Sequence, residues 1–323
     1  MWYSSLMATT TKSSKAKTKT TKAKKPAAKK PTSKNTSVKS AKSTSKPTAT
    51  KVVVSKKTIT TKDSKKSKEP KTRLQKLYAA SIVVYGLIAV AAYLLMSNLS
   101  FQLSVGYWGK DELKSVNGTQ FAPATQGVVD VQIKWIVIAL AVVSIVLPIL
   151  YLTIFKKDHE DSIKAKVMPK RWIEMAITSA IMVEAVAMLS GVLDIATLKL
   201  IGGCMIVTMI AGWMAEKRTI ETGKAAIREH YLGLITGILP WLVIISYAIF
   251  TIVFGDIRAT WFVYALYVVL VVGGSIIGKN QLLSLKRVGK FANYEAVQEN
   301  YVFLSLILRV LFSVVLIIGL HSR

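Results

Sequence analysis

Seven long apolar segments follow one another from residue 74 onward, separated by shorter polar segments. Each segment is apolar on all sides instead of along one stripe, which indicates a helix surrounded by lipid. An α-helix crosses a bilayer core in about 20 residues, and each segment is near this length. The predicted spans are 77–96, 135–155, 172–193, 198–215, 231–254, 261–278 and 301–320, and the fourth has the least length to spare. We therefore predict an all-α membrane protein with a bundle of seven transmembrane helices over residues 74–323.

The connection at 98–133, between the first two spans, is long enough to have structure of its own. It contains Tyr107 and Trp108, which are typical of strands, and then Asn117 and Gly118, which are typical of tight turns. We predict a small β-ribbon in this outer connection.

Residues 1–73 differ sharply in composition from the rest of the chain. From Thr10 to Arg73 there are 22 Lys and Arg residues against two acidic ones, and most other residues are Ser, Thr, Ala or Pro. Such a segment buries too little apolar surface to offset the entropy cost of ordering it. We predict a disordered basic arm at 1–73, which carries most of the formal net charge of +27.

The basic residues of the connections predict how the bundle is oriented, because Lys and Arg accumulate in cytoplasmic loops. The connections 156–171, 216–230 and 279–300, on the same side as the arm, hold 14 Lys and Arg residues, and the opposite side holds six. We therefore predict a multi-pass integral membrane protein with its N-terminal arm in the cytoplasm and its C-terminus outside.

Glu174, Glu184 and Arg309 are ionisable residues inside the predicted spans. A charge in the bilayer core costs several kcal/mol, so each needs a partner or a hydrated cavity. Glu174 lies about one turn beyond Pro169, and Arg309 lies roughly 12 Å past Tyr301 at 1.5 Å per residue. Because helical side chains lean toward the start of their own helix, Arg309 reaches back toward Glu174, and we predict an ion pair. For Glu184 we predict a place facing the bundle interior, with a water molecule.

Two hydroxyl groups are predicted to lie near this pair. Ser305 precedes Arg309 by one helical turn and Thr178 follows Glu174 by one turn, so each shares a helix face with its charged neighbour. No histidine falls inside a predicted span; the three histidines of the chain are His159, His230 and His321.

The third, fifth and seventh spans carry motifs that resemble those of a known family. RWIE at 171–174 resembles the third helix of the heliorhodopsins, GILPW at 237–241 resembles their fifth helix, and YVFLSL at 301–306 resembles the start of their seventh helix. The resemblance covers roughly residue 76 to the end. It implies a rhodopsin-like bundle of seven transmembrane helices with an inverted orientation, the amino terminus inside.

The resemblance also implies roles for single residues. It makes Glu174 the counterion of a retinal Schiff base and places Ser305 beside it, with the Schiff-base lysine four residues later, where this chain has Arg309. An imine forms from a neutral amine, and a guanidinium group stays protonated and is a poor nucleophile. We therefore expect no covalently bound retinal. Further candidates for the pocket or the core are Met182, Glu184, Pro240 and Trp241.

Three functions remain open at this point. The first is a heliorhodopsin-like sensory, signalling or scaffold protein without covalent retinal, in which a Glu174–Arg309 pair preserves the charge balance. The second is light sensing by retinal that is bound non-covalently. The third is ion or proton conduction through Glu174, Glu184 and Asp194, although a spacing of ten residues turns each acid by about 80° around the helix. The chain shows no phosphate-binding loop and no nucleophile–base pair, so we predict that it is not an enzyme.

The predicted partners are the lipid bilayer and, for residues 10–73, an anionic lipid surface, which attracts each nearby basic residue by about 1 kcal/mol. Nucleic acid is the less favoured partner, because the arm has no aromatic residues between Thr9 and Arg73 on which bases could stack. Gly233 and Gly237 form a small-residue face that suits close helix packing within the bundle, with a homodimer contact as the alternative.

Overall fold

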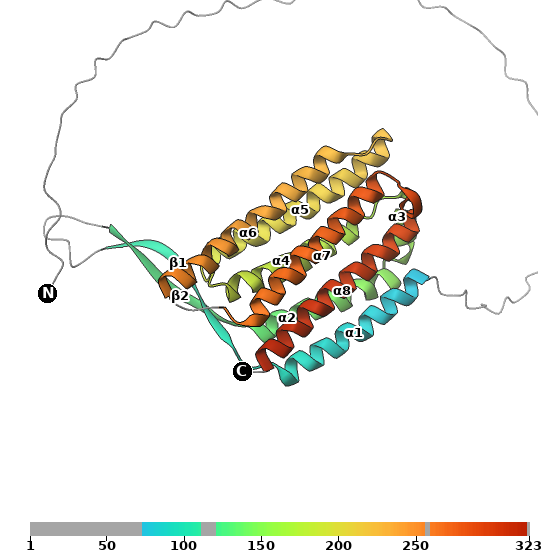
Figure 1. Cartoon of the computed structure of the whole chain (residues 1–323). Coiled ribbons are helices and arrows are strands. Elements are labelled where there is room, and N and C mark those ends of the chain that lie inside the picture. Colours follow the sequence, from blue (N-terminus) through green and yellow to red (C-terminus); the bar gives the residue numbers. More distant parts are fainter. Residues whose placement is uncertain (1–72, 111–120, 256–258, 322–323) are drawn as a thin grey trace, which may run out of the picture. The chain divides into compact units, whose positions relative to one another are not determined.

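The structure, a computed structural model, describes residues 73–110, 121–255 and 259–321 (Figure 1). Within these residues, seven helices are long and apolar enough to cross a membrane, which confirms the predicted class of fold. They are α1 (Arg73–Leu95), α2 (Ile133–Leu152), α4 (Pro169–Leu189), α5 (Ile195–Thr222), α6 (Ile227–Gly255), α7 (Trp261–Leu285) and α8 (Tyr294–His321). The predicted arm at 1–73 lies outside the described residues except for Arg73, the first residue of α1.

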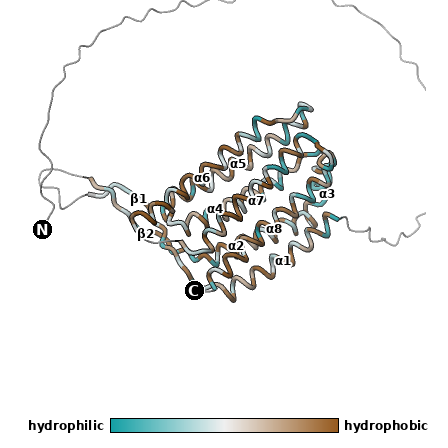
Figure 2. Tube along the Cα trace, in the orientation of Figure 1, coloured by the Kyte–Doolittle hydropathy of each residue, from teal (hydrophilic) through white to brown (hydrophobic). Residues whose placement is uncertain are grey.

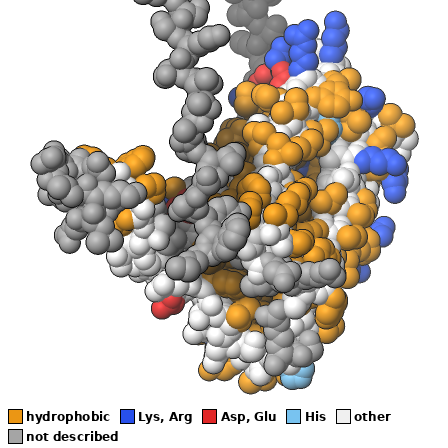
Figure 3. All heavy atoms as spheres, turned by 60° about the vertical axis from the view of Figure 1, so that its left-hand side comes forward, with side chains coloured by type: hydrophobic (Ala, Val, Ile, Leu, Met, Phe, Trp, Pro, Cys, Tyr) orange, Lys and Arg blue, Asp and Glu red, His pale blue; other side chains and the backbone are white. Residues whose placement is uncertain are grey.

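All the spanning helices but α7 begin before the apolar segments that predict them, and α5, α6, α7 and α8 also end beyond those segments, whereas α1, α2 and α4 end one to four residues before the predicted ends. The fourth span, predicted to be barely long enough, belongs to α5, which has 28 residues, and α8 begins at Tyr294, before the predicted start at residue 301. Helical hydrogen bonding continues through polar residues after the chain leaves the lipid, so the apolar pattern marks the bilayer and not the helix ends. Figure 2 shows hydrophobic residues along the middle of the helices and more polar residues toward the end where α3 lies. Figure 3 shows hydrophobic side chains over much of the visible face and Lys and Arg toward one end.

α4 is the most enclosed of the seven helices. In the most apolar 18-residue stretch of α4, 72% of the residues are buried, whereas the share is 33% or less in the corresponding stretch of each of the other six helices. It contacts α2, α5, α6 and α7, while α8 contacts α1 and α7. An ionisable side chain on α4 therefore faces protein and not lipid on most sides, which is where a buried charge can find a partner.

The outer connection forms the predicted β-ribbon. β1 (Ser100–Lys110) and β2 (Phe121–Gln132) pair antiparallel from Ser100 opposite Gln132 to Lys110 opposite Phe121, with an irregularity between Leu103 and Ser104. The backbone N–H of Ser104 donates to the carbonyl oxygen of Leu193 at 2.9 Å, which attaches the ribbon to the connection between α4 and α5. The predicted turn residues 117 and 118 lie outside the described residues.

The short helix α3 (Lys156–Ala165) was not predicted from the sequence. Its charged composition is that of a loop, and ten residues are too few for the apolar pattern to stand out. One residue of its inner face, His159, is buried against two aromatic rings, Tyr78 of α1 and Tyr151 of α2, with ring centroids 5.6 Å away in both cases. His159 is thus one contact that holds α3 to the bundle, together with Ile163, which packs on the same cluster, and the ion pair of Asp158 with Lys170 at 3.1 Å.

Acidification should release α3. The pKa of His159 lies below its usual value of 6.5, mainly because the ring is buried and, to a smaller extent, because the positive charge of Lys170 is near. The packed state therefore favours neutral histidine, so its stability is complete above about pH 6.5 and is lost as the pH falls through the lower folded-state pKa. We expect amide hydrogen exchange over residues 156–165, corrected for intrinsic rates, to rise on acidification. His159→Phe should abolish that rise while His321→Gln keeps it, and a rise that persists in His159→Phe would assign the release to another group.

Candidate functional site

A buried ion pair joins α8 to α4. Arg309 Nη1 lies 2.7 Å from Glu174 Oε1, and only 3% and 12% of the two side chains are exposed. The same nitrogen donates to Ser144 Oγ on α2 at 3.2 Å, and Tyr85 of α1 lies within hydrogen-bonding reach of Arg309 and Ser144. The contact predicted between Glu174 and Arg309 is therefore present, and four helices meet at it.

The two hydroxyl groups predicted near the pair line the same cavity as Arg309 but donate to backbone carbonyl groups instead of to the pair. Thr178 Oγ1 donates to the carbonyl oxygen of Glu174 at 2.9 Å, and Ser305 Oγ donates to the carbonyl oxygen of Val302 at 3.1 Å. Each side chain thus satisfies its own helix backbone, as Ser and Thr commonly do inside helices. One hydroxyl that accepts from Arg309 belongs to Ser144, which sequence reasoning missed because an isolated serine in an apolar span carries no signal.

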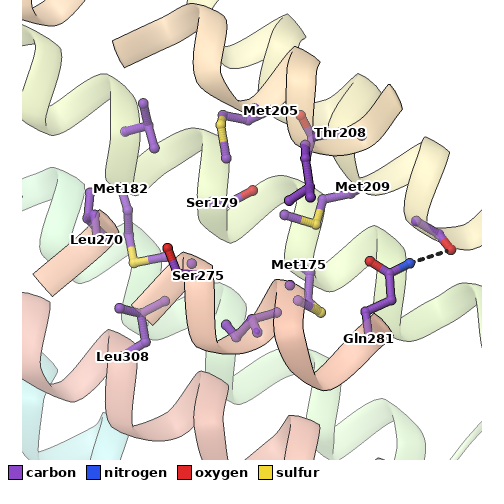
Figure 4. Close-up of a pocket in the computed structure, with 18 of the residues that line it drawn as sticks. Met175, Ser179, Met182, Met205, Thr208, Met209, Leu270, Ser275, Gln281 and Leu308 are labelled. Atoms are coloured by element: carbon purple, nitrogen blue, oxygen red, sulfur yellow. Dashed lines mark hydrogen bonds between the residues drawn. The ribbon is translucent and has the colours of Figure 1, made fainter. Parts of the chain in front are cut away.

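A cavity of about 410 Å³ lies beside the ion pair, between α4, α5, α6, α7 and α8. Four methionines contribute to its apolar lining, and Figure 4 labels them: Met175, Met182, Met205 and Met209. Of the residues proposed from the sequence, those that line the cavity are Thr178, Met182, Trp241, Ser305 and Arg309. The rings of Trp241 and Tyr267 pack edge to face, with their centroids 6.1 Å apart. Pro240, the neighbour of Trp241, is buried within α6 and does not line the cavity.

His230 lies inside a helix, although the sequence places it in the connection 216–230, outside the predicted spans. It was assigned to a connection, but α6 begins at Ile227, so His230 is helical, buried and part of the cavity lining. Its Nδ1 lies 3.1 Å from Gln281 Oε1, and Gln281 Nε2 donates to the carbonyl oxygen of Gly212 at 3.0 Å, the bond drawn in Figure 4. The cavity therefore has a second polar group at the α6–α7 end of its lining.

Glu184 and Asp194, the other two acids considered for ion or proton conduction, take no part in the ion pair of Glu174 and Arg309. Glu184 is half-buried and its carboxylate lies directly against Gly202 of α5, and no charged side chain of the described residues pairs with it. Asp194 caps the start of α5, where it accepts from Thr197 N and Thr197 Oγ1, both at 2.7 Å. These hydrogen bonds hold the pKa of Asp194 below its usual value. Glu174, Glu184 and Asp194 thus occupy three different environments.

A second buried charge cluster surrounds Glu216 of α5. Its carboxylate accepts from Arg171 Nη2 at 3.0 and 3.1 Å, from Trp172 Nε1 at 2.7 Å and from the Tyr294 hydroxyl at 2.7 Å. The backbone N–H of Met168 adds a longer contact at 3.4 Å. This carboxylate therefore ties α4, α5 and α8 together.

Sequence reasoning missed this cluster because the predicted fourth span ended at residue 215 and placed Glu216 in a loop. One signal could have found it. An indole N–H and a guanidinium side by side at Arg171 and Trp172, at the start of a buried helix, both require an acceptor. The Trp172 ring lies so close to Gly212 that a Cβ there would be 2.5 Å from its Cζ3 atom, so the indole packs directly on the backbone of α5.

The small-residue face of α6 packs within the chain. A Cβ added at Gly233 would lie 3.2 Å from the carbonyl oxygen of Thr208, and one at Gly237 would lie 3.3 Å from the Thr208 methyl group. Close approach of α5 and α6 therefore accounts for both glycines, which is the first of the two alternatives drawn from the sequence. The homodimer contact stays a prediction.

The chemistry available at the site follows from these groups. Arg309 supplies hydrogen-bond donors and a permanent charge, Glu174 neutralises that charge, and the cavity offers a mainly apolar lining. Among the described residues, no group of three or more His, Cys, Asp or Glu side chains could hold a metal ion. The arrangement suits the binding of an apolar molecule.

Several solved structures resemble this chain, and one family model matches it. The transmembrane domain of the Salpingoeca rosetta rhodopsin phosphodiesterase aligns with a TM-score of 0.48 at 14% identity, over 77% of this chain and 84% of that one. Thermophilic rhodopsin aligns with a TM-score of 0.47 at 10% identity, over 77% of this chain and 92% of that one. A search of the curated proteins found no match. The family model of the heliorhodopsins matches residues 74–319, and the chain therefore belongs to the heliorhodopsin family.

Proposed function

We propose that this protein is a sensory, signalling or scaffold member of the heliorhodopsin family that does not attach retinal covalently. The observation that carries the proposal is the buried ion pair of Arg309 and Glu174, at 2.7 Å. By the resemblance, Arg309 stands at the position of the Schiff-base lysine and Glu174 at that of its counterion. The permanent pair then takes over the charge balance that a protonated imine and its counterion would supply.

Covalent retinal does not fit the residues at this site. An aldehyde condenses with a neutral amine, whereas the guanidinium of Arg309 stays charged and its carboxylate partner stabilises that charge. α8 contains no lysine between Tyr294 and His321 that could replace it. The cavity is nevertheless kept, with a volume of about 410 Å³. This supports a protein that retains the pocket of its family and uses it differently.

The orientation and the role of the arm belong to the same proposal. The 14 basic residues in the connections on the side of the arm, against six opposite, support a cytoplasmic N-terminus. In that orientation the basic segment 10–73 faces the anionic leaflet and adheres to it electrostatically. We also propose that this chain is not an enzyme.

Two other functions have less support. Light sensing with non-covalent retinal is compatible with the cavity volume. Conduction through Glu174, Glu184 and Asp194 is disfavoured, because the first is paired with Arg309, the second lies against Gly202, and the third caps α5.

Incubation of the purified protein with all-trans retinal tests the proposal. The wild type should develop no red-shifted visible band, and borohydride should trap no retinyl adduct, because the site offers no neutral amine. Arg309→Lys restores an amine beside Glu174 and should develop such a band, with an adduct that mass spectrometry places on the substituted residue.

Arg309→Gln is the matched control, since it removes the charge without supplying an amine and should stay colourless. A reducible imine in the wild type would refute the proposal. A folded Arg309→Lys variant without colour would contradict the retained pocket while leaving the absence of covalent attachment intact.

A further inference from the structure

We propose that the cavity beside Arg309 binds an elongated, uncharged alcohol, whose hydroxyl group accepts from Arg309 and donates to Ser305. The inference rests on the proposed function, because it requires a position 309 that is free of a covalent ligand. Beyond that function, the ligand is an alcohol, and Arg309 and Ser305 form hydrogen bonds to its head group.

The shape and lining of the cavity describe the body of the ligand. The lining follows α6 from His230 to Trp241, a distance of roughly 16 Å at 1.5 Å per residue. Its volume of about 410 Å³ falls within the range of roughly 300–1,000 Å³ of small-molecule pockets. Flexible methionine side chains on α4 and α5 adapt to an irregular apolar surface. A long hydrocarbon body matches this apolar lining.

The charges around the cavity select an uncharged head group. Arg309 is neutralised by Glu174, and the nearby Arg171 is neutralised by Glu216. A ligand carboxylate would add an unpaired negative charge to a buried site that is already neutral, at a large desolvation cost. A neutral head group adds none.

The hydrogen-bonding groups select an alcohol over an aldehyde. A guanidinium has five N–H donors; the two on Nη1 serve Glu174 and Ser144, and Tyr85 lies within reach of one more, so at least two donors on Nη2 and Nε remain. Ser305 lies one helical turn before Arg309, lines the same cavity, and gives its own proton to Val302, which leaves its oxygen as an acceptor. A hydroxyl can satisfy both at once, by accepting from Arg309 and donating to Ser305. An aldehyde can use only the first.

Three probes with one skeleton and different head groups separate these possibilities: all-trans retinol, all-trans retinal and all-trans retinoate. Binding to the full chain in detergent is followed by energy transfer from tryptophan, since Trp172 and Trp241 line the cavity. Retinol should bind most tightly and retinoate at least about tenfold more weakly. Ser305→Ala should weaken retinol about tenfold and leave retinal unchanged, because only the alcohol donates to that oxygen.

Two variants complete the test. Glu174→Gln makes the site positive and should reverse the order, so that retinoate binds more tightly than retinol. Ser246→Ala removes a hydroxyl on α6 that donates to the backbone of its own helix and does not line the cavity, and it should change neither affinity. Tightest binding of retinoate by the wild type, no binding of retinol by folded wild type, or equal loss of retinol and retinal in Ser305→Ala would overturn the inference. A retinal adduct trapped by borohydride would instead overturn the proposed function.

Discussion

Replacing Glu174 by Gln is expected to lower the free energy of unfolding by about 3–5 kcal/mol. The substitution keeps the size of the side chain and removes its charge. Arg309 is then left charged, 3% exposed and without its counter-charge, in the interior of a membrane protein. Unfolding by denaturant in mixed micelles, followed by circular dichroism, measures the loss.

Two comparisons isolate the effect of charge. Glu184→Gln, on the same helix, removes a carboxylate that pairs with no charge among the described residues, and it should change stability by less than about 1 kcal/mol. Combining Glu174→Gln with Arg309→Gln should recover most of the loss, because no unpaired charge remains. If the single Glu174 variant is as stable as the wild type, the ion pair does not hold the interior together.

Glu216→Gln should have an effect of similar size, about 3–5 kcal/mol, for a related reason. The Glu216 side chain is 9% exposed and that of Arg171 is 6% exposed, so the buried guanidinium would lose the one ionic partner it has among the described residues. Glutamine also offers a single acceptor oxygen, whereas the carboxylate uses both oxygens to accept from Trp172 and Tyr294. The same unfolding measurement applies.

The matched control is Glu221→Gln, one and a half turns further along α5. Glu221 pairs with Lys217 in solvent, with about 60% of its side chain exposed, so the change should stay within about 0.5 kcal/mol. Trp172 fluorescence should also shift in Glu216→Gln and not in Glu221→Gln, since its indole nitrogen donates to Glu216. Equal stability of the two variants would show that the cluster is unimportant.

The sequence predicts the framework of the site because two patterns in it have a large effect on free energy: apolar runs that must lie in lipid, and charges inside those runs that need a partner. Seven apolar runs predict the spans, and a glutamate and an arginine inside two of them require each other. The depth of each residue and the lean of its side chain were enough to pair Glu174 with Arg309, which lie 135 positions apart. These inferences need only helix geometry and the cost of a buried charge.

What the sequence does not predict lies at the polar ends of the helices. Glu216 lies just after the apolar run of α5, and His230 lies just before that of α6. At such positions a helix that continues beyond the lipid has the same polar composition as a loop. The partners of a polar residue in such places depend on how helices pack, which no local pattern contains. Ser144 was missed for the converse reason, because one serine within an apolar run looks like any other spacer.

The pairing of Glu174 with Arg309 has a consequence for biosynthesis. α4 emerges from the ribosome well before α8, so Glu174 enters the bilayer at a time when its cation has not yet been synthesised. Until α8 arrives, the growing protein must keep this acid protonated or hydrated at a cost of several kcal/mol. Chains that stop before α8 therefore retain an unmatched acid within the membrane, which marks them as incomplete by the same charge that stabilises the finished bundle.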